Sequence, residues 1–226
     1  MAAARSRQLR EQARPLDSAY RASVGELLRA VNAATAGVGP PSDERFPIAA
    51  APTPFLHAFA DGINWILRSP LIHEIKKDGS AVVIVPRGFV SDLASIPEPL
   101  QILRGRVPNS RKYINASLVH DYLYWRQDCT RAQADNIMLI AMAEAGVSAL
   151  ERRLVYEGVR RFGQGAWDGN RRARESRLIR TVAAPDDVVP PTGTWTEYRE
   201  WLRANRGKEG HEFKVPEAVC RAGDSE

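Results

Sequence analysis

The spacing of apolar positions predicts three consecutive helices in the middle of the chain. The first spans about 110–127, the second runs from Thr130 to Gly146, and the third runs from Ser148 to Gly163. Thr130 and Ser148 each stand three residues before a Gln or Glu, which is the spacing of a capping box at a helix start. Because the connections are short, we expect successive helices to pack antiparallel.

Two runs rich in Ile and Val precede these helices and flank the dipeptide Asp78-Gly79. They predict a β-hairpin with strands at about 71–76 and 81–85, since Asp-Gly suits the positive φ angles of a tight turn. Residues 86–108 are rich in proline and also carry apolar positions that need burial, so we expect an ordered loop there. The predicted fold class is α+β and mainly helical: three antiparallel helices packed with a small hairpin and a long ordered loop.

The two ends of the chain are predicted to be appendages of a core domain at 55–180. Residues 1–54 are expected to form an arm and linker, with a helix at 16–32. Residues 181–226 are expected to form a linker, a short helix and a tail. An aromatic stripe marks this last helix, and it favours docking on the chain's own core over docking on a partner; its members are Trp195, Tyr198 and Trp201.

The net charge of +5 is too small to indicate a nucleic-acid partner by itself. Nine arginines lie between Arg152 and Arg180, however, and they permit either a phosphate-facing or lipid-facing surface or an ordinary solvated helix face. The solvated face is the favoured interpretation, so nucleic acid is an unlikely partner.

The cysteines and the apolar runs bear on the compartment. Cys129 and Cys220 permit one disulfide but cannot form a metal–thiolate cluster. No apolar run reaches the ~18 residues of a membrane span, and the first residues lack the apolar core of a signal peptide. By elimination, the expected location is the cytoplasm.

Candidate chemistry centres on His120 and Asp121, which stand side by side in an apolar, aromatic stretch. Neighbouring helical residues diverge by about 100°, so the two side chains cannot pair with each other, although both can border one cavity. Asp135 lies in the first turns of the next helix, where it can orient His120. A histidine held by a carboxylate through one ring nitrogen presents the other as a general base, so His120 and Asp135 are the candidate catalytic pair.

Asp121 and Asp92 are the candidate metal ligands. One imidazole and three carboxylates suit a divalent cation such as Ca²⁺, Mg²⁺ or Zn²⁺. The residues expected to contact substrate or to support the site are Tyr124, Ser95 and Ser117. The alternative is a purely structural network, because ionisable side chains on an apolar helix need buried partners whether or not they catalyse a reaction.

Three runs in order, 85–97, 118–124 and 131–135, resemble the phage and prophage family catalogued as domain of unknown function 1353. The likeness covers roughly 65–162. It implies a phage, prophage or bacterial source and no established activity. Phage or virion proteins are therefore candidate partners, and a virion is the alternative to the cytoplasm as location.

The pattern His-Asp-x-x-Tyr at 120–124, answered by an aspartate on the next helix, is similar to the motif of bacterial phospholipase A2. By that likeness His120 would activate water, Asp121 would hold calcium and Asp135 would orient His120. The chain departs from that family in lacking the disulfides beside the motif and a clear glycine-rich calcium loop. The resulting hypothesis is a metal-dependent hydrolase of an ester or phosphoester. The alternative is a non-catalytic virion, assembly or interaction protein.

Overall fold

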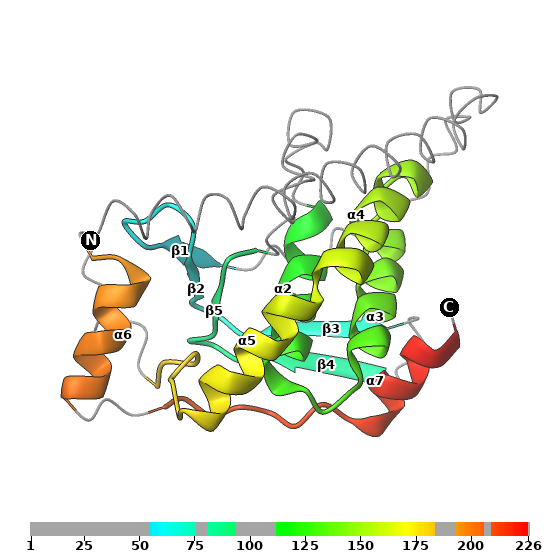
Figure 1. Cartoon of the computed structure of the whole chain (residues 1–226). Helices are drawn as coiled ribbons and strands as arrows, with labels where there is room; N and C mark the ends of the chain where they lie inside the picture. Colours follow the sequence, from blue (N-terminus) through cyan, green and yellow to red (C-terminus); the bar gives the residue numbers. More distant parts are fainter. Residues whose placement is uncertain (1–54, 76–80, 94–111, 184–192, 206–208, 226) are drawn as a thin grey trace, which may run out of the picture. The chain divides into compact units, whose positions relative to one another are not determined.

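The computed structural model describes residues 55–75, 81–93, 112–183, 193–205 and 209–225 (Figure 1). All of them lie in the second of two compact units, Pro47–Glu226. The predicted arm at 1–54 and residues 94–108 of the predicted ordered loop lie outside the described residues. The elements are β1 (Leu56–Ala58), β2 (Trp65–Leu67), β3 (Leu71–Ile75), β4 (Ala81–Val85), β5 (Val90–Ser91), α2 (Lys112–Arg126), α3 (Arg131–Glu144), α4 (Ala149–Phe162), α5 (Gln164–Glu175), α6 (Trp195–Ala204), α7 (Glu217–Ala222) and η2 (Gly223–Ser225).

The three predicted helices are present as α2, α3 and α4, and α3 packs against both of the others (Figure 1). The two predicted capping boxes define the starts of α3 and α4. The Thr130 hydroxyl accepts a hydrogen bond from the Gln133 backbone N–H at 3.2 Å, and Ser148 and Glu151 make the same exchange at the start of α4. Each box satisfies backbone donors that the first helical turn leaves unpaired. The α+β, mainly helical class is confirmed.

The predicted hairpin is also present. Strands β3 and β4 pair antiparallel, with Leu71 opposite Val85 and Ile75 opposite Ala81. Alternate residues of both strands are buried, as a half-covered sheet requires. The buried face packs on α2 and α3, so the hairpin and these helices share one hydrophobic core.

A second sheet, in the order β1–β2–β5, was not predicted. Its strands are two or three residues long, too short for alternation to be recognisable in the sequence. Part of the predicted loop therefore pairs as a strand: Val90 lies opposite Ile66, and Ser91 lies opposite Trp65. This pairing fixes Ser91 and Asp92 close to α2, which β5 contacts.

The segment after α5 joins the core, whereas the sequence predicted a linker there. Thr181 pairs with Phe89, and the Val182 backbone N–H donates to the Gly88 carbonyl at 2.9 Å. Gly88 has a φ of +86°, and a Cβ at this position would lie 2.0 Å from the Val182 carbonyl oxygen. Only glycine fits so close to the crossing backbone.

Helix α6 docks on the body of the protein through two of its three aromatic residues. Trp195 and Tyr198 are buried, with ring centroids 5.5 and 6.1 Å from that of Phe59. Asp61 accepts a hydrogen bond from the Trp195 backbone N–H at 3.0 Å, which fixes the start of the helix. Trp201 remains 51% exposed. Trp201 is therefore the one residue of the predicted partner-docking stripe whose side chain is exposed.

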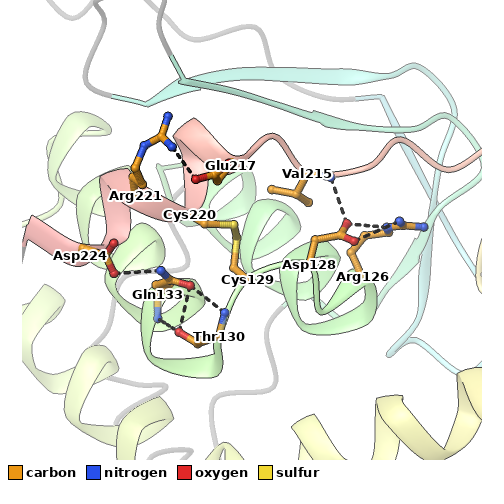
Figure 2. The surroundings of a disulfide bond; sticks show 10 residues. All are labelled: Arg126, Asp128, Cys129, Thr130, Gln133, Val215, Glu217, Cys220, Arg221 and Asp224. Carbon is orange, nitrogen blue, oxygen red and sulfur yellow. Dashed lines mark hydrogen bonds and ion pairs between the residues drawn. A yellow bond between two sulfur atoms is a disulfide. The ribbon is translucent and has the colours of Figure 1, made fainter.

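The C-terminal residues form helix α7 where the sequence predicted a tail, and a disulfide joins Cys220 of α7 to Cys129 just before α3 (Figure 2). Hydrogen bonds on both sides of the disulfide also attach the C-terminal segment to the residues around Cys129. The Val215 backbone N–H donates to Asp128 at 3.0 Å, and the Gln133 amide donates to Asp224 at 2.8 Å. The C-terminal segment is thereby held against the turn between α2 and α3.

Reduction of the disulfide should lower the free energy of unfolding by about 2–4 kcal/mol, because the bond closes a long loop and restricts the unfolded chain. Urea unfolding followed by circular dichroism, with and without dithiothreitol, measures this difference. The double variant Cys129→Ser/Cys220→Ser is the control and should be insensitive to the reductant. Equal midpoints for oxidised and reduced wild-type protein would contradict the prediction.

Candidate functional site

His120 and Asp135 meet between α2 and α3. The His120 Nε2 atom lies 3.1 Å from Asp135 Oδ1. Asp135 is fully buried, and His120 is 4% exposed. The contact exists because α2 and α3 pack closely along their lengths, which brings the middle of one helix opposite the first turns of the next.

The Asp135 carboxylate has three further partners, one from each of three helices. Tyr124 of α2 donates its hydroxyl to Oδ1 at 2.6 Å. Arg131 of α3 donates to Oδ2 at 2.9 Å, and Arg160 of α4 lies 3.8 Å from the same oxygen. Two guanidinium groups thus offset the cost of burying this carboxylate.

The hydrogen-bond partners determine which tautomer His120 adopts. A carboxylate flanked by two guanidinium groups can only accept hydrogen bonds, so a neutral His120 must carry its proton on Nε2. Within the described part of the chain, Asp135 is the hydrogen-bond partner of the imidazole. The lone pair of Nδ1 is then available to accept a proton, which is the requirement for a general base.

Tyr124 is held in place by the close approach of another backbone. Its ring lies 4.1 Å from the His120 ring and packs edge-on against Trp167 at 5.1 Å. At Gly163, between α4 and α5, a Cβ would lie 2.5 Å from the Tyr124 hydroxyl oxygen. The absence of a side chain at Gly163 therefore allows the hydroxyl to reach Asp135.

Asp121 belongs to a different network from its neighbour in the sequence. The Ser91 hydroxyl donates to Asp121 Oδ2 at 2.5 Å. The charge of Asp92 acts on Asp121, and Arg180 Nη2 lies 3.9 Å from Asp92 Oδ1. The structure therefore brings Asp92 and Asp121 together, and it places His120 with Asp135.

The environment of Asp121 favours its neutral form. Burial, and then the negative charge of Asp92, raise the pKa of Asp121 well above the ordinary carboxyl value of 3.8. Arg180 and the Ser91 hydroxyl act in the opposite direction with smaller effect. Asp121 is buried and Asp92 is partly exposed, and the proton is retained on the buried carboxyl because two neighbouring carboxyls cannot both ionise at low cost.

Arg180 was not predicted as a site residue, and neither were Ser91 and Arg160. The Arg180 Nε atom donates to the Val90 carbonyl at 2.9 Å, and its guanidinium lies over the rings of Phe89 and Trp125 at 5.6 and 5.8 Å. In the sequence it appears as one member of a basic cluster. Neither spacing nor a motif distinguishes a residue that reaches the site from a segment distant in the sequence.

The arginine cluster at 152–180 is less available to a partner than its sequence suggests, because several side chains are bound within the protein. Several of its arginines are engaged within the protein: Arg152 donates to a backbone carbonyl, and Arg161 and Arg171 form ion pairs with carboxylates on their own helices. Arg160 and Arg180 belong to the two networks above. The structure therefore provides no continuous row of free arginines along α4 and α5.

The remaining predicted site residues add little to the two networks. Ser117 is buried, and no hydrogen bond joins its side chain to His120 or Asp121. Ser95 lies outside the described residues. Among the residues the structure describes, no three His, Cys, Asp or Glu side chains gather as a metal site would require.

The comparisons with known proteins agree with the family expected from the sequence. Residues 65–159 match the family described as Protein of unknown function (DUF1353). The matched region contains β2 to β5, α2, α3 and most of α4, and so His120, Asp121, Asp92 and Asp135. No curated protein and no solved structure matches the chain.

The raised pKa of Asp121 predicts a pH-dependent stability. Between the ordinary carboxyl pKa and the raised one, the folded state binds a proton that the unfolded state has lost, so this group's contribution to stability falls as pH rises. Asp121→Asn, which is neutral at every pH, should show a shallower decline from about pH 5 to about pH 8 in urea unfolding. Asp168→Asn, in a helical ion pair on α5, is the control and should keep the wild-type slope. A steeper decline in Asp121→Asn would contradict this assignment.

Proposed function

We propose that the chain is a hydrolase of an ester or phosphoester in which His120 acts as general base. The observation that carries the proposal is the 3.1 Å contact between His120 Nε2 and a buried Asp135 carboxylate. This arrangement fixes the orientation and the tautomer of the imidazole and leaves Nδ1 to remove a proton from water. The similarity of 120–124 to the phospholipase A2 motif supports the same role.

In this proposal Asp135 orients the ring and stabilises the imidazolium that forms when His120 accepts the proton. Tyr124 and Arg131 hold the carboxylate in place. Asp121, whose pKa is raised by burial and by Asp92, is the candidate proton donor to the leaving group. A carboxyl whose environment keeps it protonated can serve as the general acid beside a separate base.

The residues near Asp121 do not fit the divalent cation that the sequence suggested. The described residues offer two carboxylates, from Asp92 and Asp121, whereas Ca²⁺ takes six to eight oxygen ligands. Arg180 already places a positive charge 3.9 Å from Asp92. The proposed reaction is therefore assigned to side chains of the protein.

Replacement of His120 by Gln should reduce hydrolysis of p-nitrophenyl butyrate or bis(p-nitrophenyl) phosphate by at least about 100-fold, because general-base catalysis contributes about that much. His57→Gln, a change in strand β1, is the matched control and should retain wild-type activity. Circular dichroism and urea unfolding of both variants show whether a loss of activity reflects a loss of folding. A folded His120→Gln protein with unchanged activity would contradict the proposal.

The alternative function is a non-catalytic interaction or assembly protein, and the burial of the site favours it. Asp135 has no exposed surface, and His120 has 4%, as expected for a network that only ties three helices together. Trp201, 51% exposed on α6, would then offer a surface to a partner such as a phage or virion protein. Under this alternative His120→Gln lowers stability, and the wild-type protein hydrolyses neither substrate.

The disulfide and the helices give information on the compartment in which the protein functions. None of the described helices is long and apolar enough to span a membrane. Disulfides persist in oxidising surroundings and are rare in a reducing cytoplasm, so the Cys129–Cys220 bond supports a location, such as a released virion, outside the reducing cytoplasm.

A further inference from the structure

A cavity of about 710 Å³ lies between the end of α5 and the C-terminal segment. Its volume is within the range of small-molecule sites. The lining residues include Trp125, Arg174, Arg177, Glu209, His211 and Glu212. Neither His120 nor Asp135 lines it, so the cavity is separate from the proposed catalytic site.

One of the two acids in the wall is already neutralised by neighbouring groups. Glu212 Oε1 accepts hydrogen bonds from Trp125 Nε1 at 2.6 Å and from the Thr181 hydroxyl at 2.8 Å. Glu212 Oε2 accepts one from Arg126 Nη1 at 3.1 Å. Arg126 also pairs with Asp128 at 3.0 Å, so its charge is already offset and it is not available to a ligand.

Two other arginines in the lining have a charge that none of the described carboxylates offsets through an ion pair. Arg174 donates through Nη1 to the backbone carbonyls of Trp125 and Arg126 at the end of α2, and none of the described carboxylates forms an ion pair with it. Arg177 is exposed and makes no ion pair with the described residues. Arg174, in the last turn of α5, and Arg177, in the turn that follows the helix, therefore present two guanidinium groups to one cavity.

Glu209 is the remaining acid. Burial and the negative charge of Glu212 raise its pKa above the ordinary value, while Arg174 and Arg126 act in the opposite direction. Its proton is therefore more strongly held than in a free glutamate. Among the residues that line the cavity, three arginines stand against two glutamates.

We propose that this cavity binds a small molecule through a phosphate group held by Arg174 and Arg177. Planar guanidinium groups bind phosphate oxygens through paired, charge-assisted hydrogen bonds. Leu178 and Gly210 complete the lining and leave room for an uncharged portion of the ligand. The segment that carries Gly210 and Glu212 is covalently tied to the core through Cys220, so this wall is held in position without the ligand.

Isothermal titration calorimetry with pyrophosphate, at constant ionic strength, tests the proposal. The wild-type protein should bind with one-to-one stoichiometry, and Arg177→Ala should bind at least about tenfold more weakly, because it loses a charge-assisted hydrogen bond. Arg172→Ala is the matched control, since this arginine is also exposed, lies five residues before Arg177 and does not line the cavity. Arg177 is itself exposed, so its replacement should leave the fold intact.

Two results would overturn the proposal. The first is the absence of saturable pyrophosphate binding by the wild-type protein. The second is an equal loss of affinity in Arg172→Ala and Arg177→Ala, which would indicate a general attraction to basic surface. Because the readout is binding to a cavity that excludes His120, either result leaves the proposed hydrolase untouched, and an inactive hydrolase leaves the cavity untouched.

Discussion

The buried carboxylate of Asp135 is the group on which the arrangement of the central helices depends. Removing such a charge from water costs several kcal/mol, and the cost is recovered only by partners of good geometry. Those partners come from every side: His120 and Tyr124 from α2, Arg131 from α3 and Arg160 from α4. Arg131 also donates to the backbone carbonyls at the end of α4. The three helices are thus joined at one carboxylate, and a shift of α2 or α4 would remove part of its partner set.

A second constraint acts where backbones cross at glycine. Gly163 lets the α4–α5 junction approach Tyr124, and Gly88 lets the segment at Val182 cross the strand region. The second crossing delivers Arg180 to the carboxyl pair of Asp92 and Asp121. The two networks are therefore built by different parts of the chain, although His120 and Asp121 are adjacent in the sequence.

The long helices and the hairpin could be predicted because their signals are local: capping residues, a repeat of apolar positions and an Asp-Gly turn. The contact between His120 and Asp135 followed from the helix repeat and a short connection. The strands of the second sheet could not be predicted, since two or three residues give no period. Helix α7 was missed for a related reason: its six residues are stabilised by a disulfide to a residue 91 positions away, which no local pattern reports.

The central claim is that Asp135 holds His120 with its proton on Nε2 and its Nδ1 lone pair free. Nitrogen-15 NMR of imidazole-labelled protein above the pH at which histidine is charged measures this tautomer directly. The account predicts an Nε2–H tautomer for His120 in the wild-type protein and a mixture of tautomers in Asp135→Asn, whose neutral amide no longer imposes a proton on Nε2. A wild-type His120 that carries its proton on Nδ1 would contradict it.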